Sequence, residues 1–122
     1  MFRLEFVSQE HEQAFENVLD VTNARSDYFS DDKFYMSMIY ILTCDFIRPL
    51  FDRITYDTDE LFEIDYNADI SVFSSTVKFM ITYALKLYFS SVENDYDFAY
   101  WFYQLSNENQ QVMLNSLKFL QH

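Results

Sequence analysis

The sequence contains no glycine and a single proline, Pro49, in 122 residues. The phosphate-binding loop of NTPases and the dinucleotide-binding fingerprint both require glycine, so the sequence excludes both. The tight two-residue turns of β-hairpins also rely on glycine, which disfavours an all-β fold. We therefore predict a helical protein.

Cysteine and basic residues are scarce as well. The only cysteine, Cys44, lies in an apolar run, and we interpret it as a small buried side chain rather than a reactive thiol. Eight Lys and Arg stand against 20 Asp and Glu, which gives a net charge of −12. This charge repels nucleic-acid phosphates and anionic membranes and favours basic proteins. We expect no direct binding to nucleic acid.

Long hydrophobic runs are missing too. No uninterrupted apolar stretch reaches the roughly 18 residues that suggest a membrane-spanning helix. The first residues, MFRLEFVSQEHEQ, lack the apolar segment of a signal peptide and become acidic at once. We predict a cytoplasmic protein without a membrane anchor.

Aromatic residues are abundant, with 14 Phe and 10 Tyr, and half of the chain is hydrophobic. Such a composition excludes a disordered chain and predicts a core rich in rings. A chain of this length forms one domain of ordinary size. We predict an all-α fold: a compact single-domain bundle over residues 1–122 with about five helices.

Apolar periodicity places the first helices. One begins after Ser8 and fades near residues 22–27. Its buried stripe is expected at Ala14, Phe15, Val18, Leu19 and Thr22. A second helix, capped by Ser30 or Asp31, is apolar nearly all round, so it should be central. Pro49 ends it, and residues 48–54 form a short helix.

The second half of the chain contains three more helical patterns. Ser71, Ser74 or Ser75 caps a long helix whose stripe is expected at Phe73, Val77, Met80, Ile81, Ala84, Leu85 and Tyr88. Residues 96–105 form a short aromatic helix. Ser106 caps a last helix, and the side chains expected to point inward from it are Met113, Leu114, Leu117 and Leu120.

An acidic stretch, residues 55–71, connects the second and third long helices and contains no Lys or Arg. We expect it to be a loop containing a helical turn or a short pair of strands. Its carboxylates are Asp57, Asp59, Glu60, Glu63, Asp65 and Asp69. A calcium-binding EF-hand loop is excluded, because Phe62 or Ile70 would take the place of its glycine. We predict a surface for a basic partner, with Tyr56 and Tyr66 as aromatic anchors.

Residues for metal binding and catalysis are poorly placed in the sequence. The zinc candidates His11, Cys44 and His122 are far apart. We interpret His11, in the first turn of a helix, as a surface residue or one that staples the helix start. We predict no catalytic residue, no metal site and no cofactor, and hence a protein that is not an enzyme. The alternative for the metal is an irregular Ca²⁺ or Mg²⁺ site among the carboxylates of the acidic stretch.

The aromatic segment DYDFAYWFYQ has two faces. One stripe is ordinary core and comprises Tyr96, Ala99, Phe102 and Tyr103. The opposite face contains Phe98 and Trp101 beside Asp97, and is hard to bury in so small a domain. Aromatic residues rimmed by acids are typical of a protein-binding face or a dimer seam.

The order of these motifs resembles a small family of unknown function from Gram-positive bacteria, their phages and mobile elements. The matching segments are FVSQEHEQAF, FYMSMIYIL, LFDR, SSTVKFMITYALKLYF and LSNENQQVMLNSLKFL. That resemblance implies no reaction and no catalytic residue. In its size, acidity and predicted location the chain is also similar to phage-encoded anti-CRISPR proteins.

Two hypotheses of function follow. The first is an inhibitor that covers the basic nucleic-acid-binding surface of a host protein, such as a CRISPR effector nuclease, with carboxylates in place of phosphates. The alternative is a helical module that self-associates through Phe98, Trp101 and their neighbours.

Overall fold

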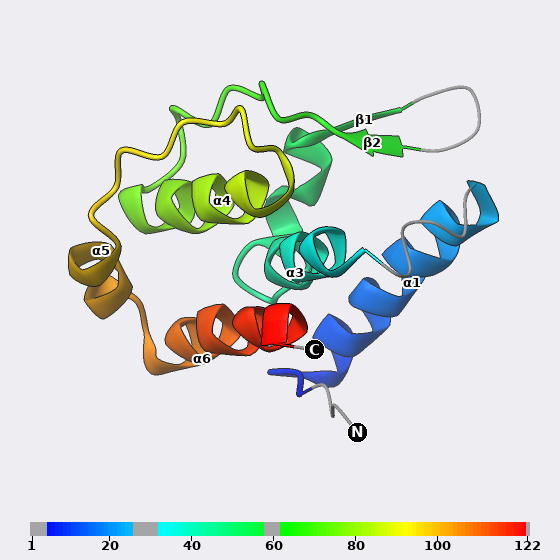
Figure 1. Ribbon diagram of the computed structural model, residues 1–122, viewed down its shortest axis with the longest axis horizontal. Coiled ribbons are helices and arrows are strands. Elements are labelled where there is room, and N and C mark those ends of the chain that lie inside the picture. Colours follow the sequence, from blue (N-terminus) through cyan, green and yellow to red (C-terminus); the bar gives the residue numbers. More distant parts are fainter. Residues whose placement is uncertain (1–4, 26–31, 58–61, 122) are drawn as a thin grey trace.

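The computed structural model describes residues 5–25, 32–57 and 62–121, without the side chains of residues 21–25, 56–57 and 62–63. Helices dominate these residues, which confirms the predicted all-α class (Figure 1). The five α-helices in the described residues are α1 (Gln9–Arg25), α3 (Lys33–Leu42), α4 (Ser75–Tyr88), α5 (Phe98–Gln104) and α6 (Asn107–Ser116). Two 3₁₀ helices accompany them, η1 (Arg48–Arg53) and η2 (Leu117–Gln121). None of the helices in this part of the chain combines the length and apolarity needed to cross a membrane.

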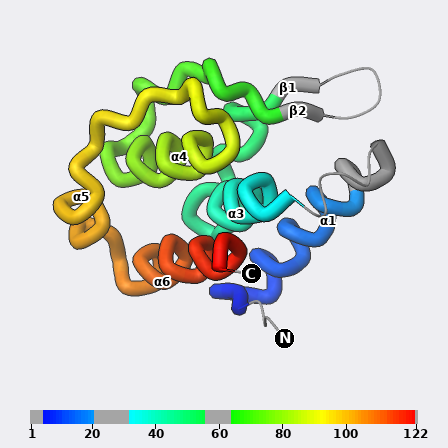
Figure 2. The backbone as a smooth tube through the Cα atoms, viewed as in Figure 1, coloured from blue at the N-terminus to red at the C-terminus, as the bar shows by residue number. Residues whose placement is uncertain are grey.

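Helix α3 lies at the centre, as its nearly continuous apolar sequence predicts. It contacts α1, α4, α6 and η2, and the chain winds around it (Figure 2). The five residues from Met38 to Leu42 have no exposed surface. The buried apolar side chains of the described residues form one cluster around this helix.

Side-chain caps start the helices near the predicted places. Ser74 caps α4 and Ser106 caps α6, each accepting a hydrogen bond from a backbone N–H three residues later. Asp32 caps α3 by accepting from the N–H of Tyr35 at 3.0 Å. The predicted caps of that helix, Ser30 and Asp31, lie outside the described residues, and the cap is one position further on.

The predicted inward stripe of α4 is confirmed at Val77, Met80, Ile81, Ala84 and Leu85, which are all buried. Phe73 and Tyr88 are partly buried and pack against the core. Phe79 lies outside this stripe but is also fully buried. Its ring packs against Tyr96 and Phe98 from the segment around α5, at centroid distances of 5.9 and 5.7 Å. Helix α4 is therefore covered on a second side as well.

Helix α6 differs from the prediction. Leu114 was expected to point inward, but it is 48% exposed. The buried residues of this helix include Asn115 and Ser116, which bind α3: Asn115 Nδ2 donates to Tyr40 Oη at 3.1 Å, and Ser37 Oγ donates to the Ser116 carbonyl at 2.8 Å. These tertiary hydrogen bonds orient α6, and a pattern of apolar residues cannot reveal them.

The acidic stretch begins with a short antiparallel pair of strands, which is one of the two forms predicted for it. Strand β1 (Thr55–Asp57) pairs with β2 (Phe62–Ile64), with Thr55 opposite Ile64. The base of this ribbon is anchored by Ile54 and Ile64, which are both buried. The ribbon therefore projects from the helical body next to η1 (Figure 1).

Candidate partner-binding surface

For most residues of the predicted acidic surface, the structure does not describe the side chains. Asp59 and Glu60 lie outside the described residues. Tyr56, Asp57 and Glu63 belong to the paired strands, where Tyr56 stands opposite Glu63, and their side chains are not described. The prediction that these residues bind a partner stays a prediction.

The three remaining predicted residues of the stretch are at the surface. Asp65 Oδ1 accepts a hydrogen bond from the Asn67 N–H, and Asp69 Oδ1 accepts from both the N–H and the hydroxyl of Ser71. These bonds from Ser71 lower the pKa of Asp69. Both carboxylates therefore also build local turns. Tyr66 is 45% exposed, and its ring stacks on Phe89 at 4.9 Å between centroids.

The aromatic face of α5 is composed differently from the prediction. Asp97 caps the helix by accepting from the Tyr100 N–H at 3.4 Å. Phe98 is 40% exposed, whereas Trp101 is partly buried and packs against the core beside Tyr96. Tyr103, expected in the core, is 75% exposed, and Ala99 is also exposed. The most exposed rings of this helix are therefore Tyr100 and Tyr103, and neither was among the predicted binding residues.

An acidic row on α1 was not recognised from the sequence. Glu12, Glu16 and Asp20 are exposed and follow one another at intervals of four residues. This spacing places one carboxylate about every 6 Å along one side of the helix. The spacing could have revealed the row, because no Lys or Arg occurs between residues 9 and 24.

The acidic row does not stabilise α1. Like charges four residues apart destabilise a helix by roughly 0.2–0.5 kcal/mol per pair. The opposite side of α1 contributes the buried His11, Phe15 and Val18, so its orientation is set by packing. Because the apolar side of α1 packs against the core, the three carboxylates on its other side are exposed to solvent.

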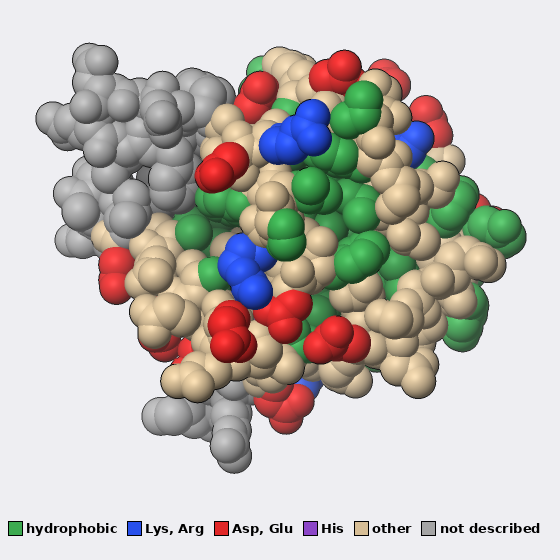
Figure 3. Space-filling view, turned by 180° about the vertical axis from the view of Figure 1, so that it is seen from behind, with side chains coloured by type: hydrophobic (Ala, Val, Ile, Leu, Met, Phe, Trp, Pro, Cys, Tyr) green, Lys and Arg blue, Asp and Glu red, His purple; other side chains and the backbone are tan. Residues whose placement is uncertain are grey.

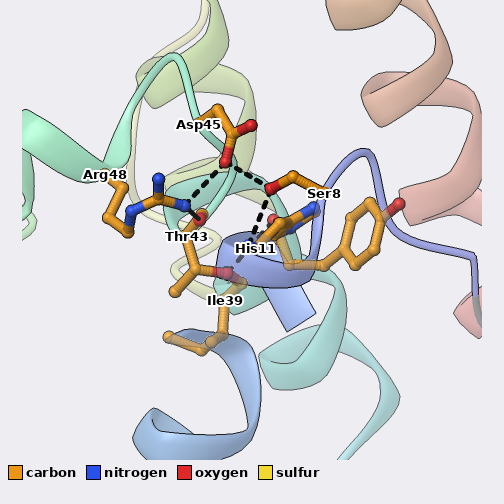
Figure 4. A network of polar contacts seen from close by, with 7 residues as sticks. Ser8, His11, Ile39, Thr43, Asp45 and Arg48 are labelled. Atoms are coloured by element: carbon orange, nitrogen blue, oxygen red, sulfur yellow. Dashed lines mark hydrogen bonds and ion pairs between the residues drawn. The ribbon is translucent and has the colours of Figure 1, made fainter. Parts of the chain in front are cut away.

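The start of α1 is fastened to the turn that follows α3 (Figure 4). Ser8 Oγ accepts from the His11 N–H at 3.0 Å and donates to Asp45 Oδ1 at 2.7 Å. Arg48 donates to the same Asp45 oxygen at 2.8 Å and to the Thr43 carbonyl at 3.3 Å. Hydrogen bonds from Ser8 and Arg48, together with the charge of Arg48, lower the pKa of Asp45 against the opposing effect of its partial burial. This network fixes the direction in which α1 leaves the core.

The prediction of a surface position for His11 is wrong, because the residue has no exposed surface. The alternative prediction, a residue that staples the helix start, agrees with the contact between its ring and that of Phe6, which precedes the helix, at 5.0 Å between centroids. His11 Nε2 donates to the carbonyl of Tyr40 at 2.8 Å. That carbonyl belongs to the last turn of α3, where it also accepts a longer hydrogen bond, of 3.4 Å, from the hydroxyl of the C-cap residue Thr43. Among the described residues Nδ1 has no hydrogen-bond partner. Burial lowers the pKa of His11, so the neutral ring is favoured.

The network does not have the arrangement of a nucleophilic site. Ser8 Oγ hydrogen-bonds the backbone of His11 and the carboxylate of Asp45, whereas the His11 ring bonds only a carbonyl. A Ser-His-Asp triad requires the ring to bridge hydroxyl and carboxylate. Burial raises the pKa of Cys44 to about 11, which keeps the thiol protonated and unreactive. Within the described ranges no three His, Cys, Asp or Glu side chains are grouped to hold a metal ion.

Comparison of the chain with protein-family models, with curated proteins and with solved structures finds no match. The resemblance to the Gram-positive family stays a prediction.

Proposed function

We propose that this protein is a phage- or mobile-element-encoded inhibitor that binds the basic nucleic-acid-binding surface of a host defence protein. The observation that carries the proposal is the row of exposed carboxylates on α1 in a chain of net charge −12. The resemblance in type to anti-CRISPR proteins supports the same assignment. Such an inhibitor acts in the cytoplasm of the host cell.

The physical basis is mimicry of phosphate. A nucleic-acid strand presents anions at regular intervals, and proteins that bind it place Lys and Arg to match them. A row of carboxylates on a rigid helix can take the same positions, because the guanidinium group binds carboxylate and phosphate in the same bidentate way. Lys or Arg side chains of this protein close to the row would weaken its attraction to a basic partner. On the face of the molecule opposite to that in Figure 1, Asp and Glu side chains lie around the rim, with a few Lys and Arg side chains among them (Figure 3).

The direct test is competition with nucleic acid. CRISPR effector nucleases of the host, loaded with guide RNA, are incubated with the protein, and target-DNA binding and cleavage are measured. We expect both to decrease as protein is added, and the inhibition to weaken with rising salt, because exposed charges are screened. DNA binding that is unchanged for these effectors at low salt would contradict the proposed partner class.

The exposed rings of α5 favour a second candidate function, self-association. Tyr100 is 56% and Tyr103 is 75% exposed, and the acidic residues Asp95 and Asp97 lie beside them in the sequence. If this face forms a dimer, replacing both tyrosines with serine should weaken the dimer by about 2 kcal/mol or more, since aromatic side chains dominate interfaces. Sedimentation equilibrium measures this, with Val72→Ser, another exposed apolar position, as the control. If the wild-type protein is monomeric at high concentration, self-association through this face is excluded.

A further inference from the structure

His11 is a titratable side chain buried beneath the start of α1. The residue has no exposed surface, and its Nε2–H is used by the hydrogen bond to the Tyr40 carbonyl. Nδ1 has no partner among the described residues. The rings of Phe6 and Tyr40 pack against the imidazole at 5.0 and 4.5 Å between centroids. The docked site therefore pairs one N–H of the ring and offers no hydrogen-bond acceptor for a second.

The groups around the ring do not compensate for an added proton. The imidazolium ion has two N–H donors and a positive charge, and an unpaired charged donor is costly to bury. From the turn after α3, Asp45 favours the charged ring, but Arg48, its ion-pair partner at 2.8 Å, opposes it. Burial raises the pKa of Tyr40 to about 12 and that of Cys44 to about 11, so both stay neutral.

The remaining charges near the start of α1 are at the surface. Lys118 of η2 forms an ion pair with Glu5 at 3.8 Å, and Glu10 and Glu12 of α1 itself are exposed. Exposed charges act weakly on a buried ring, because water screens them. The effect of burial outweighs all of these charges, and the pKa of His11 is lowered in the docked helix.

Helix α1 is the peripheral element of the bundle. Figure 1 shows it at the edge of the helical body, and α4, α6 and η2 each pack against α3 directly. The hydrogen bonds that join α6 to α3 do not involve α1. Its polar ties to the core lie at its start, where Ser8 bonds Asp45, His11 bonds the Tyr40 carbonyl, and Tyr40 Oη donates to the Glu5 carbonyl. The His11 ring thus lies among the contacts that hold α1 in place.

We propose that His11 makes the docking of α1 sensitive to acid: a proton taken up from solvent on Nδ1 releases α1 and the residues just before it, while the other helices stay folded around α3. This inference goes beyond the proposed function and does not depend on it. Because α1 also contains the acidic row, the same proton removes the fixed orientation of Glu12, Glu16 and Asp20.

Docking weakens as the pH falls, because the ring binds a proton more readily in the released helix than in the docked one. The released ring is solvated and has the ordinary pKa of 6.5, whereas the pKa of the docked ring is lowered. Docking is therefore at full strength above pH 6.5 and weakens as pH falls from there towards the lowered pKa. One proton changes the docking equilibrium by up to about tenfold per pH unit in that range.

Hydrogen exchange of the native protein, followed by NMR from pH 7.5 to pH 5, measures docking. A released helix of 17 residues with like-charged neighbours is marginal in water, so its amides exchange on release. We expect the protection factors of residues 12–20 to be lower than those of α4 throughout. Below pH 6.5 they should fall by up to about tenfold per unit while α4 remains protected at pH 5. Equal protection of the two helices would mean that α1 leaves only by global unfolding, and would overturn the proposal.

Two variants assign the effect to the ring. His11→Gln retains an N–H donor for the Tyr40 carbonyl but cannot take up a proton in this range, so the protection of α1 should no longer depend on pH. Glu10→Gln removes an exposed carboxylate from the same turn and should keep the wild-type pH dependence. A dependence that persists in His11→Gln would assign it to carboxylates and refute the role of His11.

Wild-type NMR gives a second measurement if His11→Gln already leaves α1 undocked. The Hε1 signal of His11 and the amide signals of residues 12–20 are followed in one titration. They should change together, with a midpoint below pH 6.5, while the amide signals of α4 change little. A ring that takes up its proton while α1 keeps its protection would show that the docked site accepts the charge, and would refute the switch.

Discussion

Replacing His11 with alanine is expected to lower the free energy of unfolding by about 3 kcal/mol, from a lost buried hydrogen bond and the cavity that remains. The Tyr40 carbonyl at the end of α3 would lose the ring that now pairs with it at 2.8 Å. For a domain of this size the melting temperature should fall by roughly 10 °C. Thermal unfolding followed by circular dichroism measures the effect.

The control lies on the same helix. Gln13 is exposed, and its side chain bonds only Asn17 one turn later, so Gln13→Ala should change the melting temperature little. If His11→Ala were as harmless as Gln13→Ala, the ring would not be a structural partner of α3.

The same variant has a pH signature. Burial lowers the pKa of His11 in the folded protein from its ordinary 6.5; Arg48 acts in the same direction, while Asp45 and the Tyr40 carbonyl oppose. The unfolded chain therefore takes up a proton at a pH where the folded protein does not. The stability that His11 contributes is complete above pH 6.5 and is lost as pH falls from there towards the lowered pKa. We expect the difference in melting temperature between wild type and His11→Ala to narrow from pH 7.5 to pH 5. A constant difference would mean that the ring titrates alike in both states.

Neutralising the acidic row of α1 is expected to have the largest effect on binding. Glu12→Gln with Glu16→Gln should weaken the complex with a basic partner about tenfold or more, mainly through a slower association rate. Adding Asp20→Asn should weaken it further. Unfolding should be unchanged or slightly less favourable, because the like-charged pairs one turn apart are removed. Binding kinetics at several salt concentrations measure the effect, and wild-type binding should depend on salt more steeply than variant binding.

A matched variant distinguishes the row from net charge. Glu93→Gln with Asp95→Asn also removes two exposed carboxylates, from the segment between α4 and α5. If the row is the interface, this control should bind nearly as wild type does. An equal loss in both variants would show that only the overall charge of −12 matters.

The helices, most of their caps and the central place of α3 were predictable from the sequence, because these features depend on residues within a few positions of one another. Ser74 and Ser106 cap helices through bonds that reach three residues. An apolar run such as residues 38–42 must be buried wherever the chain folds. Glycine-dependent sites were excluded by composition alone. The acidic row of α1 was also present in the sequence, as a simple spacing of four residues.

Other features depended on partners far away in the chain, and only the tertiary structure decided them. His11 is buried because it pairs with a carbonyl 29 residues away, and Ser8 reaches Asp45 across 37 residues. Tyr103 is exposed while Trp101 packs inward, because the position of α5 against α4 determines which rings are covered. A hydrogen-bonding side chain gives no signal in the sequence of which distant group it will meet, since that depends on packing of the whole chain.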